Sequence, residues 1–154
     1  MIRTDELTSS ASVETCFEVG ADVEKWPAIL PHYRWVRFRD KQDFAKGVVE
    51  MAAWRPFGFL KYPTWWVSDM WRDPVRPVVY YRHFDGITRG MDVRWEFDET
   101  DTGTRIRIVH EWDGPRWPMI GRLAANAVIG PVFVSAIAQR TLAGVVAEAE
   151  RRTG

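Results

Sequence analysis

Apolar and polar residues alternate with a period of two through most of the middle of the chain. The alternation is clearest in residues 91–98, whose apolar members are Met91, Val93, Trp95 and Phe97. A strand with one buried face has this pattern. Residues 105–112 repeat it and place Ile108 and His110 on the apolar side. The same reading predicts further strands at residues 2–8, 33–40, 48–54, 60–72 and 78–84, with Pro63 interrupting the fourth of these.

Two short helices are predicted between the first and second strands. Ser12 is suited to cap a helix over residues 13–19, which Gly20 would end. Asp22 is suited to cap a second helix over residues 23–30, and Pro31 would stop it. Together they would form a helical elbow.

The C-terminal part of the chain has the period of a helix. Small and apolar residues recur on one face of residues 118–151, with arginines opposite. This predicts one long helix, kinked at Pro131 because proline lacks the N–H that the helix interior needs.

The order of these elements predicts an α+β fold of about seven antiparallel strands, two short helices and a long C-terminal helix. A curved sheet wrapped around that helix satisfies the order and leaves a cavity beneath it. The length of 154 residues suits one domain, and we expect residues 1–154 to form it.

Composition narrows the classes of function. Lys plus Arg and Asp plus Glu number 21 each and the pI is near 6.8, so no overall field favours nucleic acid. Cys16 is the only cysteine, which excludes an intrachain disulfide and a cysteine-built zinc site. The N-terminal residues lack a signal-peptide pattern and no 18-residue apolar stretch could span a bilayer. We therefore expect a cytoplasmic protein without a transmembrane segment.

Aromatic residues make up 14% of the chain, including nine tryptophans. Tryptophan is seldom needed merely to fill a core, so some of these rings are expected to line a cavity for a hydrophobic small molecule. The alternative for each ring taken singly is an ordinary core position.

Three stretches carry a resemblance to a known superfamily. They are ADVEKWPAILPHYRWVR, with its D-x-x-x-W-P phrase from Asp22 to Pro27, HFDGITRGMDVRWEF, and GPVFVSAIAQRTLAGVVAEAE. With the order of elements, they make the chain similar to the helix-grip superfamily of START and polyketide cyclase/dehydrase proteins. The resemblance implies either a cyclase/aromatase or a carrier for a quinone, lipid or other hydrophobic molecule. It implies no cofactor, and His32, His83 and His110 lack the spacing of the metal ligands found in the related oxygenases.

The cyclases that the chain resembles fold an acyl-carrier-bound poly-β-ketone in the cavity and promote aldol cyclisation and dehydration. Such chemistry needs a base near neutral pH and donors for developing oxyanions. His110 is the first candidate for the base, against the alternative of a core histidine that is merely hydrogen-bonded. His32 is read as a surface or mouth residue.

The inward face of residues 78–84 is open from sequence alone. Either Tyr81 and His83 point into the cavity as donor and base, or Arg82 does so as an oxyanion clamp beside Tyr80. The third alternative is that this strand is a solvated edge of the sheet without a functional role.

The expected cavity wall combines strand and helix residues of mostly apolar character. Its members are Trp66, Ser68, Met70, Met91, Val93, Trp95, Ile108, Val134, Ser135 and Ala138, with Arg82 as the charged candidate. A filled core is the alternative.

Two protein partners are also expected. An acyl carrier protein would dock near the cavity mouth, which lies either under residues 56–63 or at the helical elbow. Ile129, Phe133 and Ala136 project from the otherwise polar side of the long helix. Either a second copy of the chain covers them, or the kink at Pro131 rotates this face and buries it.

Overall fold

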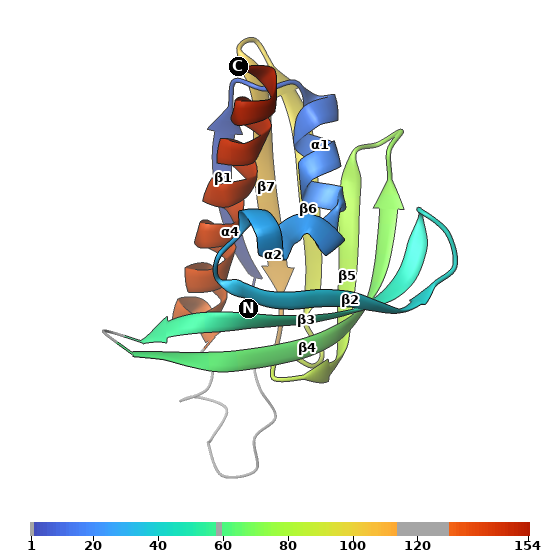
Figure 1. Cartoon of the computed structure of the whole chain (residues 1–154), viewed down its shortest axis with the longest axis vertical. Coiled ribbons are helices and arrows are strands. Elements are labelled where there is room, and N and C mark those ends of the chain that lie inside the picture. Colours follow the sequence, from blue (N-terminus) through green and yellow to red (C-terminus); the bar gives the residue numbers. More distant parts are fainter. Residues whose placement is uncertain (1, 58–59, 114–129) are drawn as a thin grey trace.

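The computed structural model describes residues 2–57, 60–113 and 130–154, which form one curved antiparallel sheet with helices against its concave face (Figure 1). The strands are β1 (Ile2–Ser9), β2 (Tyr33–Lys41), β3 (Lys46–Phe57), β4 (Leu60–Asp73), β5 (Val78–Gly86), β6 (Asp92–Thr100) and β7 (Gly103–Glu111). The helices are α1 (Val13–Ala21), the 3₁₀ turn η1 (Val23–Lys25), α2 (Trp26–Ile29) and α4 (Gly130–Thr153). The predicted α+β fold, with seven strands and a long C-terminal helix, is confirmed.

The sheet has the strand order β1-β7-β6-β5-β4-β3-β2. Every neighbouring pair is antiparallel, so the first strand of the chain lies beside the last and β2 forms the opposite edge. Alternate residues of β6 and β7 are buried, as the sequence pattern predicts. The buried side chains face the helices, because only the concave side of the sheet is covered.

The β3–β4 hairpin is longer than predicted. Trp54 pairs with Pro63, so β4 runs through the proline without a break. The N–H of Trp54 donates to the carbonyl of His32 at 2.7 Å, so it points away from β4. Pro63 therefore occupies a position of the ladder where its missing N–H costs no bond to β3, and β5 pairs with β4 only from Trp66 onward.

The helical elbow differs in detail from the prediction. Ser12 does cap α1, accepting a hydrogen bond from the Thr15 N–H at 3.2 Å. The helix continues through Gly20 to Ala21, however. Gly20 packs against Phe97, where a larger residue would collide, so this glycine serves packing and does not end the helix. Asp22 makes no side-chain cap and pairs with Lys25 instead, at 3.0 Å. The second helix is accordingly split into η1 and α2.

The C-terminal helix α4 is described from Gly130 onward. Residues 118–129 of the predicted helix, with Ile129, lie outside the described residues, as does the Phe133 side chain. Pro131 lies in the first turn of the described helix. The predicted kink involves residues before Gly130, which lie outside the described residues. Ala136 is half-buried. No helix among the described residues is long and apolar enough to cross a membrane.

The helix α4 lies across the concave face and meets α1, α2 and β1 (Figure 1). Its contact with the elbow is close at Gly144, where an added Cβ would come within 2.1 Å of Leu30 Cδ2. Leu30 itself is 1% exposed. A glycine at this position lets the elbow and the helix approach each other over the cavity.

We predict that Gly144→Ala lowers the free energy of unfolding by about 1–3 kcal/mol, because the methyl group overpacks the contact with Leu30. Alanine favours helix by about 1 kcal/mol over glycine, which offsets part of that loss. Urea unfolding measures the change. The double variant Gly144→Ala/Leu30→Ala should lose less than the sum of the single variants, and simple additivity would contradict the proposed collision.

Candidate active site

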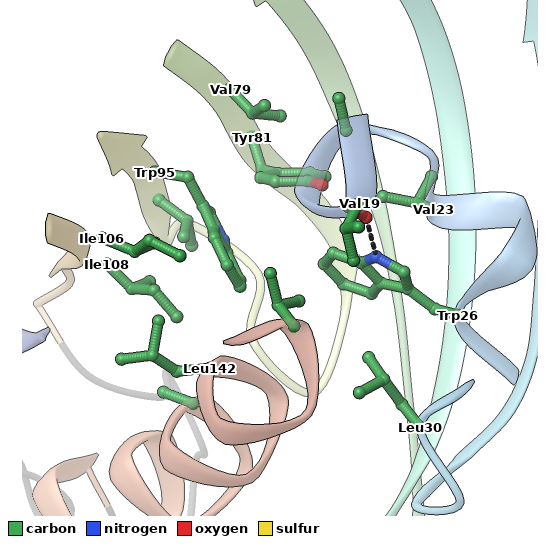
Figure 2. Packing of buried hydrophobic residues seen from close by; sticks show 14 of the residues in the cluster. Val19, Val23, Trp26, Leu30, Val79, Tyr81, Trp95, Ile106, Ile108 and Leu142 are labelled. Atoms are coloured by element: carbon green, nitrogen blue, oxygen red, sulfur yellow. Dashed lines mark hydrogen bonds between the residues drawn. The ribbon is translucent and has the colours of Figure 1, made fainter. Parts of the chain in front are cut away.

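A cavity of about 70 Å³ lies between the concave face of the sheet, the elbow and α4. Its wall is mostly apolar and strongly aromatic. The lining residues are Trp26, Tyr33, Met51, Trp66, Tyr81, His83, Thr88, Met91, Val93, Trp95, Ile108, His110, Val134, Ile137, Ala138 and Thr141. Figure 2 shows Trp95 and Trp26 among the buried side chains. Their ring centroids are 5.6 Å apart and the ring planes are tilted by 44°.

Strand β5 brings Tyr81 and His83 to the cavity. They are 5% and 7% exposed, whereas Arg82 between them points to the outer face and pairs with Asp92 at 3.2 Å. The pairing of Tyr81 with Met70 and Val93 places all three on the concave side. The structure therefore decides which residues of 78–84 face inward: Tyr81 and His83 do, and Arg82 is not a cavity residue.

Two contacts fix the imidazole of His83. Its Nδ1 lies 2.5 Å from the Thr88 hydroxyl, and its ring stacks on Trp66 with an interplanar angle of 4°. Thr88 belongs to the loop that joins β5 to β6. That loop is closed by hydrogen bonds from the His83 N–H to the Met91 carbonyl and from the Gly90 N–H to the His83 carbonyl. The loop and the strand therefore hold the ring as one unit.

The hydroxyl of Tyr81 is buried and makes no hydrogen bond to another described residue. Burial raises the pKa of Tyr81 well above its usual range, and nearby Tyr33 adds to the effect against the opposing charge of Arg72. The phenol is therefore neutral and can donate a hydrogen bond to a bound molecule. An uncommitted donor in an apolar cavity is costly unless a ligand uses it.

His110 reaches the cavity from β7. It is 8% exposed, and its Nδ1 is buried without a hydrogen-bond partner among the described residues. Its Cα partner on β1 is Arg3, and on β6 it pairs with Val93. The sequence pattern thus placed it on the correct face of its strand.

Burial keeps all three histidines neutral. It lowers the pKa of His110 to about 4, with a further contribution from Arg3, and that of His83 to about 3, with a contribution from His110. It lowers the pKa of His32 to about 4, assisted by Arg140. At pH 7 each ring has a lone pair and can accept a proton or a hydrogen bond.

Most of the expected wall lines the cavity, but four members do not. Ser68, Met70 and Ser135 are buried beside it, with 0%, 1% and 8% exposure, and Arg82 lies on the outer face. The hydroxyls of Ser68 and Ser135 are buried without partners in the described part of the chain.

His32 was expected at the surface or mouth and is instead buried. Its Nε2 lies 2.9 Å from the Thr141 hydroxyl, which itself donates to the Ile137 carbonyl at 2.8 Å. Because that hydroxyl has one proton, the imidazole must donate from Nε2. His32 thus ties the start of β2 to α4.

The sequence analysis did not single out several lining residues. They are Trp26, Tyr33, Thr88, Ile137 and Thr141. Alternation along residues 48–54, with Glu50 outward, predicts Val49, Met51 and Ala53 on the inward face, and the structure confirms Met51 in the cavity wall. The D-x-x-x-W-P phrase contains Trp26. No sequence pattern indicated Thr88 or Thr141, because a turn has no periodicity and a single threonine on a helix face does not stand out. Within residues 2–57, 60–113 and 130–154, no group of three or more His, Cys, Asp or Glu side chains is placed to hold a metal ion.

Comparison with known proteins adds family information to this geometry. The sequence model of a family described as polyketide cyclase/dehydrase and lipid transport matches residues 9–133. A Streptomyces cyaneus protein, named as a proposed polyketide cyclase, is 27% identical over 110 residues, which is 70% of each chain.

Two solved structures share the fold. A protein of Thermus thermophilus superposes with a TM-score of 0.83 at 14% identity, over 100% of both chains. The Zhui aromatase/cyclase of Streptomyces sp. R1128 superposes with a TM-score of 0.76 at 23% identity, over 100% of this chain and 97% of its own.

We predict that the free energy of unfolding falls as the pH drops from 6.5 toward 4. The folded pKa of His110, about 4, lies below the unfolded value near 6.5, so the unfolded chain binds more protons in this window. His110 alone accounts for about 3 kcal/mol at most. Urea unfolding at pH 7.5, 6 and 5 measures the slope. His110→Gln should make the slope shallower, with His32 and His83 contributing the rest, and an unchanged slope in that variant would contradict the buried, neutral assignment.

Proposed function

The chain belongs to the polyketide cyclase/dehydrase and lipid transport family, and from this premise we propose that it is a polyketide cyclase/aromatase. Its substrate would be a hydrophobic polyketonic chain carried by an acyl carrier protein. The observation that carries the proposal is the convergence of three groups on one aromatic cavity: the His83 and His110 imidazoles and the Tyr81 hydroxyl, which has no hydrogen-bond partner among the described residues. An apolar wall with a few convergent polar groups is the usual form of a small-molecule site.

The proposed reaction begins with proton transfer. The lone pair of His110 takes a proton from a methylene flanked by two carbonyls, and the resulting enolate carbon attacks a ketone carbon of the same chain. A carbon–carbon bond forms, and the ketone oxygen becomes an alkoxide that takes back the proton from the imidazolium. Loss of a second α-proton and of hydroxide, combined as water, then gives the double bond. Tyr81 donates a hydrogen bond to the oxygen on which charge develops.

The low pKa of His110 is compatible with this role because a methylene between two carbonyls is unusually acidic. The imidazole is unprotonated throughout the neutral range, so no protonation step limits it there. His83, stacked on Trp66 and bonded to Thr88, would hold a carbonyl of the folded chain or act as a second acceptor.

The cavity has to widen for such a substrate. Its volume of about 70 Å³ is that of a few water molecules, whereas sites for drug-sized ligands have volumes of about 300–1,000 Å³. Met51 and Met91 line the wall, and their unbranched side chains can change rotamer to make room.

A carrier function is the second candidate. The observation in its favour is that both cavity histidines have a pKa well below 7, whereas a general base is usually tuned toward the working pH. Such a protein would hold a quinone, a lipid or another hydrophobic molecule unchanged. Mass spectrometry of molecules extracted after purification from the native host separates the two. A stoichiometric quinone or lipid supports the carrier, and an aromatic polyketide supports the cyclase.

A homodimer through the middle of the C-terminal helix stays a prediction. Light scattering at high micromolar concentration tests it, and a monomer under those conditions would contradict it.

We predict that Tyr81→Phe lowers formation of cyclised product in a reconstituted polyketide synthase by about 10²–10³-fold, the usual effect of removing an oxyanion donor. His110→Gln should lower it by about 10²–10⁴-fold, as for a general base. The rate of the native protein should be flat between pH 6 and 8, because His110 does not titrate there. Tyr80→Phe is the matched control: it is the neighbouring tyrosine, 43% exposed on the outer face. A loss in Tyr80→Phe equal to that in Tyr81→Phe would contradict the assignment.

We predict that Ala138→Leu abolishes ligand binding and turnover while leaving the fold intact. Ala138 lines the cavity from α4, and three extra carbon atoms would occupy much of its present volume. Ala143→Leu, on the exposed side of the same helix, is the control. Intrinsic tryptophan fluorescence on titration with the reconstituted product measures binding, since Trp26, Trp66 and Trp95 face the cavity. Undiminished binding by Ala138→Leu would place the ligand elsewhere.

A further inference from the structure

Two buried histidines of the chain are each bonded to a threonine hydroxyl, and the two pairs differ in what fixes the histidine proton. His32 Nε2 lies 2.9 Å from the Thr141 hydroxyl, which donates its own proton to the Ile137 carbonyl at 2.8 Å. That hydroxyl can only accept from His32, so the proton of His32 is fixed on Nε2. The pair formed by His83 and Thr88 has no such third group.

The Thr88 hydroxyl can act in either direction. It makes no hydrogen bond to a described group other than His83, whose Nδ1 lies 2.5 Å away. Both residues are buried, with 4% and 7% exposure for Thr88 and His83. A hydroxyl has one proton and two lone pairs, so by rotating it can donate to a bare Nδ1 or accept from an Nδ1–H. Nδ1 is therefore satisfied in both tautomers of His83.

The state of Nδ1 determines what the other ring nitrogen offers to a ligand. Burial lowers the pKa of His83 to about 3, with a contribution from His110, so the ring is neutral at pH 7 and has one N–H. When Thr88 donates to Nδ1, the proton is on Nε2, which is then a donor. When Thr88 accepts from Nδ1, Nε2 has a lone pair and is an acceptor. Nε2 makes no hydrogen bond within the described part of the chain, and His83 lines the cavity.

The ring stays in one place whichever nitrogen has the proton. It stacks on Trp66, with the ring centroids 5.9 Å apart and the planes within 4° of parallel. The backbone holds Thr88 beside it: the Met91 N–H donates to the Thr88 carbonyl at 3.1 Å, and the His83 N–H donates to the Met91 carbonyl at 2.9 Å. A change of tautomer therefore needs one hydroxyl to rotate and one proton to exchange with water or ligand, without movement of the imidazole.

The proposed cyclisation reverses the hydrogen-bonding character of the ligand. A poly-β-ketone presents carbonyl oxygens, which only accept. When the new ring becomes aromatic, each ketone oxygen that it retains gains a hydrogen while an adjacent ring carbon loses one, so that oxygen becomes a phenolic hydroxyl, which donates. A fixed donor or a fixed acceptor would hold only one of the two forms well, because the other would leave a buried polar group unpaired.

We propose that Thr88 is a positioning residue that lets His83 bind a ketone oxygen as a donor and an enol or phenol oxygen as an acceptor, at one position. The ligands are β-dicarbonyl compounds and the aromatic hydroxyl compounds formed from them. The proposal rests on the proposed cyclase function. It adds that successive intermediates of the reaction keep their hydrogen bond to His83 and therefore their orientation in the cavity.

The test compares two small probes that have oxygen atoms at the same spacing. The carbonyls of 2,2-dimethylcyclohexane-1,3-dione can only accept, whereas the hydroxyls of resorcinol can donate. Titration of the full chain, followed by ¹⁵N NMR of the histidine rings, measures both the dissociation constant and the tautomer. We expect the proton of His83 on Nε2 with the dione and on Nδ1 with resorcinol. His32 should keep its proton on Nε2 in both complexes and is the internal reference.

The variant Thr88→Val keeps the shape of the side chain and removes the hydroxyl. A buried N–H without a partner is rarer than a buried acceptor without one, so His83 should keep its proton on Nε2 in this variant. We expect binding of the dione to change by less than about twofold and binding of resorcinol to weaken by about fivefold or more. Thr88→Ser should bind both probes as the native protein does, and Thr102→Val, at an exposed turn between β6 and β7, is the control for the substitution itself.

Three results would overturn the proposal. Equal weakening of both probes by Thr88→Val would indicate that Thr88 has only a structural role. The same His83 tautomer in both complexes of the native protein would show that the pair does not adapt. Failure of the native protein to bind either probe would contradict the assigned class of ligand. Circular dichroism verifies that each variant is folded.

Turnover in a reconstituted polyketide synthase separates this inference from the proposed function. Thr88→Val should lower kcat by about tenfold and change KM by less than about twofold, because the ketone form is still bound. A native protein that forms cyclised product while His83 keeps one tautomer with both probes retains the cyclase function and loses this inference. A native protein whose His83 changes tautomer between the probes but that forms no cyclised product retains the site and loses the cyclase function.

Discussion

The structure depends on covering one concave apolar face with one long helix. The sheet curves so that alternate residues of its strands converge, and α4 with the elbow lies over them (Figure 1). Gly144, in the middle of α4, lets the helix approach Leu30 closely, and the hydrogen bond between His32 and Thr141 ties the same part of the helix to the start of β2. The helix does not fill the whole concavity, and a small cavity remains between the sheet and the helix residues Val134, Ile137, Ala138 and Thr141.

The polar groups in that cavity are buried in apolar surroundings at a cost in free energy. Burial makes His83 and His110 weak bases and leaves the Tyr81 hydroxyl without a partner among the described residues. Each unsatisfied buried group costs about 1–3 kcal/mol, so a core selected only for stability would have no reason to retain them. A ligand that supplies carbonyl oxygens to the phenol would recover that energy, which connects the cost of burying these groups to recognition.

The two faces of β3 and β4 differ in chemical character. Inward residues of β3 and β4 form an apolar wall, while outward residues one position along form a charged, hydrogen-bonded layer over tryptophan rings. Because side chains alternate between the two faces of a strand, the neighbouring residues Glu50 and Met51 lie on the outer face and on the cavity face of β3. A cavity wall and an exterior surface can therefore be built from one hairpin.

The sequence by itself determined the architecture and much of the wall. Alternation along β6 and β7 predicts which residues of each strand are buried, and it placed Trp95, Ile108 and His110 on the correct face. Tertiary structure alone decided the face of β5, because Val78 to His83 is apolar on both sides except at Arg82, and only pairing with Met70 and Val93 turns Tyr81 and His83 inward. It also decided the course of β4 through Pro63, the burial of His32 and the contact of Thr88 with His83. These depend on register and on contacts between distant segments, about which local periodicity contains no information.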